Sequence, residues 1–139
     1  MKVVENLKMI GHILDNRYKI LEEVGTGGMA VVYKAQDILL DRIVAVKILL
    51  AKYGDDHDFV VRFRQEAQAA AKLSHPNIVN IYDVGYDENV HYIVMEYVRG
   101  ETLKEYIEKH GHLPINTSIQ ITFDIGEALE NAHKNGVDG

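Results

Sequence analysis

The stretch that decides the fold is the glycine-rich loop Gly25-Thr26-Gly27-Gly28-Met29-Ala30, followed by the strand-like runs Val31-Val32-Tyr33-Lys34-Ala35 and Ile43-Val44-Ala45-Val46-Lys47-Ile48. Glycines let a backbone lie against phosphate oxygens without an intervening side chain. Taken alone, such a loop is equally typical of an ordinary hairpin turn. In a dinucleotide-binding fold the glycines would open a helix, whereas here β-branched and aromatic residues follow them. The loop is therefore predicted to join two strands.

The lysine in the second run sharpens this interpretation. Side chains of a strand alternate between its two faces, so Ala45 and Lys47 share one face while Val44, Val46 and Ile48 share the other. A small residue beside a lysine, on the face that the loop would cover, suits a flat base and a phosphate. A solvent-facing lysine on a half-buried strand is the alternative for a lysine without such a loop.

Composition narrows the class of protein. The chain has 139 residues, no cysteine and a formal charge of −6, a length that suits one modest domain with a real core. No histidines are spaced as metal ligands, and the acidic balance argues against nucleic acid as a partner. No apolar run is long enough for a membrane span, and the N-terminus lacks the profile of a signal peptide. We expect no metal site in this chain and a cytoplasmic location.

Further strands flank the glycine loop on both sides. Residues 1–16 show no clear periodicity and form a separate N-terminal segment. The predicted strands and turns are Tyr18–Val24, the turn region Asp37–Arg42, and strands Ile78–Tyr86 and His91–Tyr97 joined by Asp87-Glu88-Asn89. Together with the two runs after the glycines they predict a sheet of five strands.

One helix is predicted between these strands, over about Phe59–Leu73, entered through the polar segment Tyr53–Asp58. Its stripe of Phe59, Phe63, Glu66, Ala70 and Leu73 recurs at helical spacing. A carboxylate on the inward face costs several kcal/mol if unpaired, by the usual order of magnitude, so Glu66 needs a cation, and Lys47 is the natural candidate. The alternative is a glutamate at the edge of the stripe that reaches water.

The pattern changes after Arg99-Gly100-Glu101. Thr102 is predicted to cap a short helix that ends at about Lys109, and a longer helix is predicted over about Asn116–Asn135. Its apolar residues spread over more than one face, which is typical of a helix buried on several sides. Too little chain remains to cover Ile121, Ile125, Ala128 and Ala132 as well as Ile119 and Phe123. We therefore expect a homodimer through this helix.

Five motifs in order resemble the amino-terminal part of a protein kinase, and the resemblance covers nearly the whole chain. The motifs are Gly25-Thr26-Gly27-Gly28-Met29-Ala30-Val31-Val32-Tyr33, Val44-Ala45-Val46-Lys47, Phe63-Arg64-Gln65-Glu66-Ala67, His75-Pro76-Asn77-Ile78-Val79 and Ile93-Val94-Met95-Glu96-Tyr97-Val98. The wording of the loop is most similar to bacterial Ser/Thr kinases whose full-length members carry PASTA repeats. The resemblance implies an α+β fold: a kinase-like small lobe with a five-stranded antiparallel sheet and one packed helix, followed by two helices of a truncated C-lobe. It also implies the domain limits 17–98 and 99–139.

The resemblance further implies an ATP site with named residues. Val24 and Val32 would pack above the adenine, Ala45 would lie beside it, and Met95 would close the back of the pocket. The Glu96 carbonyl and the Val98 amide would bind the adenine edge, where the chain leaves the sheet. Lys47 would contact the α- and β-phosphates, held in place by Glu66. The implied phosphate loop consists of Gly25, Thr26, Gly27, Gly28, Met29 and Ala30.

Two departures from the family pattern matter. The third glycine of the general kinase loop is Ala30 here, which leaves the loop less free to approach phosphate. The His-Arg-Asp catalytic loop and the Asp-Phe-Gly metal site that would follow Asn135-Gly136-Val137 are not in these 139 residues, and Asp138 stands in no matching context. We therefore expect these residues alone to be catalytically inactive, while the parent kinase would use ATP and Mg²⁺ to phosphorylate protein Ser or Thr.

Other functions remain open at this point. The chain could be an isolated kinase lobe that regulates or dimerises without phosphotransfer, or a truncation with no role of its own. A dinucleotide enzyme fails because a strand follows the glycines. The parent could be anchored in a membrane by a downstream segment that is not present here.

Overall fold

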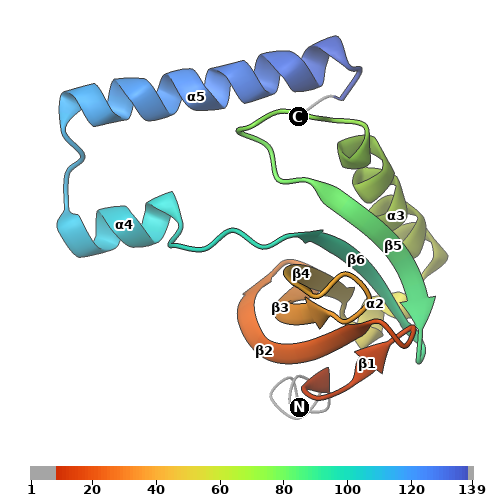
Figure 1. Ribbon diagram of the computed structural model, residues 1–139. Helices are drawn as coiled ribbons and strands as arrows, with labels where there is room; N and C mark the ends of the chain where they lie inside the picture. The colour runs from red at the N-terminus through yellow and green to blue at the C-terminus, as the bar shows by residue number, and fades with distance from the viewer. Residues whose placement is uncertain (1–8, 138–139) are drawn as a thin grey trace. The chain divides into compact units, whose positions relative to one another are not determined.

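The computed structural model describes residues 9–137, so residues 1–8 of the predicted N-terminal segment lie outside the described residues, as does Asp138. The described chain forms two compact units (Figure 1). One unit holds the described residues up to Ala71 together with Asn80–Tyr97. The other holds Lys72–Val79 together with the described residues from Val98 onward. The predicted domain limits 17–98 and 99–139 stay a prediction.

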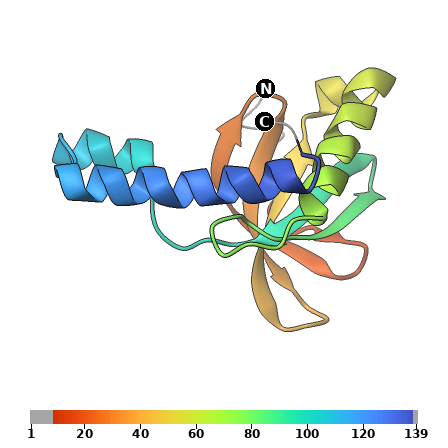
Figure 2. The same ribbon diagram turned by 90° about the horizontal axis from the view of Figure 1, so that it is seen from above.

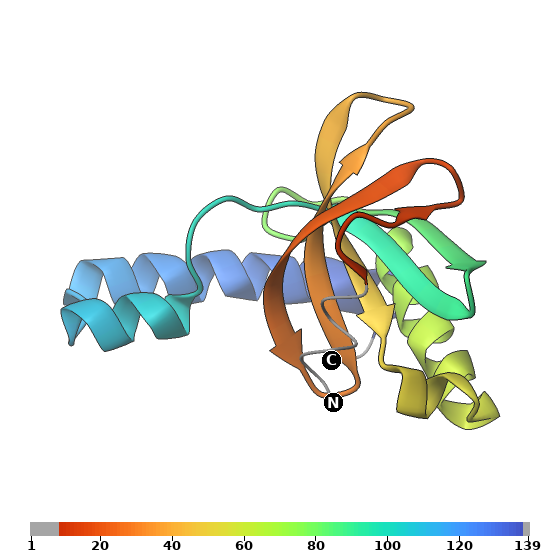
Figure 3. The ribbon, with the colours of Figure 1, turned by 90° about the horizontal axis from the view of Figure 1, so that it is seen from below.

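An antiparallel sheet of six strands makes up most of the first unit, in the order β1-β2-β3-β4-β6-β5. Its strands are β1 (Ile13–Leu14), β2 (Tyr18–Gly27), β3 (Ala30–Asp37), β4 (Arg42–Leu49), β5 (Ile81–Asp87) and β6 (Val90–Glu96). The predicted α+β class with an antiparallel sheet and one packed helix is confirmed. The β3–β4 hairpin projects from the sheet, as Figures 2 and 3 show from opposite sides.

Strand β1 was missed by the sequence analysis and adds a sixth strand to the expected five. It pairs only Ile13 with Lys19 and Leu14 with Tyr18. Two residues are too few to show an alternating pattern, which is why periodicity could not reveal it. Leu14 is nevertheless fully buried in the core, so this short strand ties the N-terminal segment to the sheet.

The two faces of the sheet form two cores, as the alternation of β4 predicts. Val44, Val46 and Ile48 belong to the larger core. The second core joins Leu49 and other residues of the opposite face to helix α3 (His57–Ala71), which contributes Phe63 and Ala67. The core on the larger side consists of Leu14, Tyr18, Ile20, Val31, Tyr33, Ala35, Val44, Val46, Ile48, Tyr92 and Val94.

Helix α3 begins two residues earlier and ends two residues earlier than predicted. The Asp56 carboxylate accepts hydrogen bonds from the backbone amides of Asp58 (3.0 Å) and Phe59 (3.5 Å), so an acidic side chain marks the helix entry. A further short helix, α2 (Ala51–Gly54), precedes it and was not predicted.

The hairpin between β5 and β6 has the predicted turn. Glu88 and Asn89 have φ angles of 50° and 64°, the left-handed conformation that a two-residue hairpin turn of type I′ requires. Strand β5 begins at Ile81, three residues later than predicted. Within it, Gly85 is needed for packing, because a Cβ atom there would lie 2.3 Å from atoms of the Tyr92 ring.

Helix α4 (Leu103–His110) and helix α5 (Ile115–Lys134) run antiparallel in the second unit (Figure 2). The predicted cap is confirmed: the Thr102 side chain accepts from the Glu105 amide, and the Glu105 side chain accepts in return from the Thr102 amide. In the same unit the Asn77 side chain donates to the Asp124 carbonyl at 3.0 Å. Within residues 9–137 no helix is long and apolar enough to cross a membrane.

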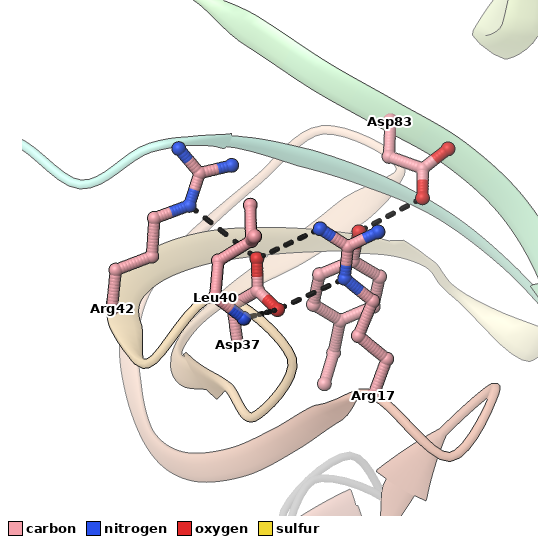
Figure 4. Close-up of polar contacts among 6 residues, drawn as sticks. Arg17, Asp37, Leu40, Arg42 and Asp83 are labelled. Carbon is pink, nitrogen blue, oxygen red and sulfur yellow. Dashed lines mark hydrogen bonds and ion pairs between the residues drawn. The ribbon is translucent and has the colours of Figure 1, made fainter.

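A buried ion cluster closes the turn end of β3 (Figure 4). The Asp37 side chain is fully buried and accepts from Arg17 through two nitrogens, Nε at 2.9 Å and Nη2 at 3.0 Å. Arg42 Nε and the Leu40 amide add contacts of 3.4 and 3.3 Å. The sequence analysis assigned Asp37 only to a turn region.

Candidate nucleotide-binding site

The glycine-rich loop joins β2 to β3, as predicted. β2 ends at Gly27 and β3 begins at Ala30. Only Gly28, with φ at 57°, needs glycine for its backbone conformation. No other atom lies within 4 Å of the position that a Cβ would take on Gly25 or Gly27. The fold itself therefore does not require glycine at these two positions, and the space over the exposed loop is left open for a ligand.

The sheet register brings four predicted site residues to one face. Val32 pairs with Lys47 across β3 and β4, and Ala45 pairs with Met95 across β4 and β6. Directly paired residues of antiparallel strands point to the same face, and Ala45 and Lys47 are two positions apart. The patch is therefore a small residue, a lysine, a valine and a methionine on a single sheet face, next to the strand that carries the glycines.

The expected pairing of Lys47 with Glu66 is open in this structure. Lys47 is partly buried, Glu66 is exposed, and the part of the chain that the structure describes has no ion pair between them. The inward positions of α3 are Phe63 and Ala67, one turn apart, so Glu66 stands at the margin of the stripe. The expectation that Glu66 faces inward was wrong for this conformation, and the alternative of an edge glutamate that reaches water describes it.

The segment that would bind the adenine edge begins where β6 ends, at Glu96. The Glu96 amide donates to the Asn80 carbonyl at 2.8 Å. The Glu96 carboxylate accepts from both the amide and the side chain of Asn80, each at 3.2 Å. Beside it, Lys34 Nζ lies 5.5 Å from the centre of the Tyr97 ring. Sequence analysis missed Asn80 and Lys34, because nothing in their local pattern distinguishes them from other polar strand residues.

The second unit carries the last of the predicted site residues, Val98, whose side chain is exposed. Val24 and Thr26 are likewise exposed, and Met29 packs partly against the second core. Within residues 9–137 no three His, Asp or Glu side chains gather closely enough to hold a metal ion.

Comparison with known proteins decides the family. The family model described as "Protein kinase domain" matches residues 18–138 of the chain. The chain belongs to the protein kinase domain family. The resemblance to kinases that the five motifs indicate is thereby confirmed.

Kinases of bacteria are among the similar proteins. The Bacillus subtilis serine/threonine-protein kinase PrkC is 51% identical over 129 residues, and the Mycobacterium tuberculosis serine/threonine-protein kinase PknB is 44% identical over 128 residues. The matches cover 93% and 89% of this chain but 20% of each of those two kinases. The chain thus spans about a fifth of the length of the curated kinases it matches.

Solved kinase structures have the same fold. The crystal structure of the Mycobacterium tuberculosis PknI kinase domain superposes with a TM-score of 0.77 at 28% sequence identity. The match covers 91% of this chain and 51% of that kinase domain. The predicted fold, a kinase small lobe with helices of the following lobe, is therefore confirmed, and the matched region is about half of that kinase domain.

Proposed function

We propose that this chain is the ATP-binding part of a Ser/Thr protein kinase. The single observation that carries the proposal is the patch of Val32, Ala45, Lys47 and Met95 on one sheet face beside a glycine loop. The open space over Gly25 and Gly27 supports it, because a backbone that no side chain shields can approach phosphate oxygens.

Each residue has a proposed role in the nucleotide site. Val24 and Val32 pack above the adenine and Ala45 lies beside it, while Met95 closes the back of the pocket. The Glu96 carbonyl and the Val98 amide bind the adenine edge. Lys47 contacts the α- and β-phosphates, and Glu66 approaches Lys47 in the active conformation, closing the pair that is open here. The backbone amides of Gly25 to Ala30 cover the phosphates.

Catalysis belongs to the parent kinase in this proposal. The family uses ATP and Mg²⁺, and the parent would transfer the γ-phosphate of ATP to Ser or Thr of protein substrates. The 139 residues contain no His-Arg-Asp and no Asp-Phe-Gly sequence, so we propose that by themselves they transfer no phosphate. We also propose a cytoplasmic location, with any membrane anchor in a part of the parent beyond these residues.

A calorimetric titration with ATP tests this proposal. We expect weak binding whose affinity is the same with and without Mg²⁺, because adenine and phosphate contacts are present and a metal cluster is not among the described residues. We also expect no transfer of label from γ-labelled ATP to a basic protein substrate. An absence of ATP binding would contradict the proposed site. Label transfer that disappears in Lys47→Ala would contradict the proposed inactivity.

A homodimer through α5 is our proposal for the partner of this chain. Ile119, Phe123 and Ile125 expose 63%, 59% and 51% of their surface, whereas Ile121 is partly buried. Apolar surface left in water costs about 25 cal/mol per Å². A second copy that presents the same helix across a two-fold axis would cover this surface.

The variant Ile125→Glu tests the dimer. We expect light scattering to give a dimer mass for the wild type and a monomer mass for Ile125→Glu, because a charge in the apolar interface would be left unpaired. Gln120→Glu adds the same charge at an exposed polar position of α5 and should remain dimeric. A monomeric wild type, or an Ile125→Glu variant that stays dimeric, would show that this helix is not the interface.

A further inference from the structure

One exposed asparagine holds the residue at which the sheet ends. Asn80 and Glu96 exchange three hydrogen bonds: the Glu96 amide donates to the Asn80 carbonyl, and the Asn80 amide and side chain both donate to one oxygen of the Glu96 carboxylate. The distances are 2.8, 3.2 and 3.2 Å. Asn80 directly precedes β5, whose first residue, Ile81, pairs with Met95. The contact therefore extends the β5–β6 ladder by one step beyond its last strand pair.

The next residue along the chain is held from the other side. Lys34 Nζ lies 5.5 Å from the centre of the Tyr97 ring, a distance at which a cation and an aromatic ring attract each other. Lys34 is paired with Ala45, which is in turn paired with Met95, so it comes from the strand two places away in the sheet. Asn80 and Lys34 thus hold Glu96 and Tyr97, the two residues that share one peptide group.

That peptide group contains the Glu96 carbonyl. Its orientation depends on the rotations on either side of it, within Glu96 and within Tyr97. The contacts to Asn80 restrict the Glu96 backbone and side chain, and the contact to Lys34 restricts the Tyr97 side chain. A hydrogen-bond acceptor that is already oriented binds its donor without paying the entropy of ordering at the moment of binding.

We propose that Asn80 is a positioning residue for base selection: by holding Glu96, it orients the Glu96 carbonyl toward the 6-amino group of adenine. This inference rests on the proposed nucleotide site. Asn80 contacts the chain and not the nucleotide, so it acts through Glu96. Its own side chain is exposed, and its loss removes little buried surface, so its effect on stability is small.

The test compares ATP with purine riboside triphosphate, which lacks the 6-amino group. The wild type should bind ATP about two- to tenfold more tightly, the range that one net hydrogen bond provides. In Asn80→Ala this ratio should fall toward one, through weaker ATP binding, while the affinity for purine riboside triphosphate stays unchanged. A merely structural defect would weaken binding of both nucleotides alike. Both affinities are measured by calorimetry on the 139-residue chain.

Further variants separate the side-chain contact from the residue itself. Glu96→Ala keeps the backbone carbonyl and should lower the ratio as Asn80→Ala does, and the double variant should lose no more than either one. Asn80→Asp places two carboxylates together and should also lower the ratio. Adding Glu96→Gln to it exchanges donor and acceptor and should restore the ratio. Gln68→Ala, which removes an exposed amide side chain from α3, should keep the wild-type ratio.

Three results would overturn the inference. An Asn80→Ala variant that keeps the wild-type ratio, or that loses affinity for both nucleotides equally, would show that Asn80 does not orient the carbonyl. A wild type that binds ATP and purine riboside triphosphate equally well would show that the carbonyl does not select adenine. A wild type that binds neither nucleotide would contradict the proposed function itself, and the inference would fall with it.

Discussion

Replacing Asp37 with alanine is expected to lower the melting temperature of the chain by about 10 °C, from a loss of about 3 kcal/mol in the free energy of unfolding. Asp37 is fully buried and is bound by Arg17 and Arg42 (Figure 4). Removing one member of a buried ion cluster leaves the others without a partner, which is among the costliest single changes in a protein. The two arginines reach solvent in part, and this keeps the loss at the lower end of the range for buried pairs.

The charge of Asp37 makes part of this stability depend on pH. The hydrogen bonds from the Arg17 guanidinium, helped by the Leu40 amide and Arg42, lower the pKa of Asp37 from 3.8 to about 2. A group with a lowered pKa in the folded state stabilises the fold above its unfolded pKa and loses this contribution as the pH falls through the folded value. The stability difference between wild type and Asp37→Asn should therefore be constant above about pH 5 and shrink between pH 4 and pH 2.

Thermal unfolding followed by circular dichroism at several pH values measures both effects. Asp41→Asn is the matched control, since Asp41 is an exposed acid of the same turn and asparagine tolerates its φ of 49°. This control should melt close to the wild type at every pH. If Asp37→Ala melted within a degree or two of the wild type, the cluster would contribute little to the fold, and the structural importance given to it here would be wrong.

Replacing Lys47 with alanine is expected to weaken ATP binding about 10- to 100-fold, the range for losing a hydrogen-bonded contact to a charged group. Lys47 lies on the sheet face that also carries Ala45 and Met95, on the strand next to the one that leaves the glycine loop. Its ammonium group is the only proposed side-chain cation for the phosphates. Because adenosine has no phosphates, its affinity should be the same for wild type and variant.

Calorimetric titration with ATP and with adenosine distinguishes a phosphate contact from general damage to the site. Lys19→Ala removes an exposed lysine from β2, away from the proposed nucleotide face, and should bind both ligands as the wild type does. An equal loss of ATP and adenosine affinity in Lys47→Ala would mean that the lysine supports the sheet and does not bind phosphate. An unchanged ATP affinity would remove Lys47 from the proposed site.

Several features could be predicted because their causes are local in the chain. β-branched residues after the glycines predicted strands on both sides of the loop, and the register then placed Val32 and Lys47 as partners. Thr102 and Glu105 form the capping box at the start of α4, since a cap involves residues only three positions apart. Glu88 and Asn89 make the predicted turn for the same reason.

Features that depend on partners far along the chain could not be predicted in this way. Arg17 reaches Asp37 across 20 positions, and Asn80 reaches Glu96 across 16. Each of these polar residues is ordinary in its local pattern, and only the strand order brings it to its partner. The pairing of Lys47 with Glu66 failed for a related reason, because helical periodicity places Glu66 near the inward stripe but does not determine how α3 is rotated against the sheet.

The sequence by itself determined the order of strands and helices, the glycine loop, the shared face of Ala45 and Lys47, and the kinase family. Each follows from periodicity, turn chemistry or motif spacing, which are properties of short segments. Only the tertiary structure decided that Leu14 adds a sixth strand, that Asp37 is the buried centre of an ion cluster, and that Asn80 holds Glu96. Burial and long-range hydrogen bonds exist only after distant segments have packed together, so no local pattern encodes them.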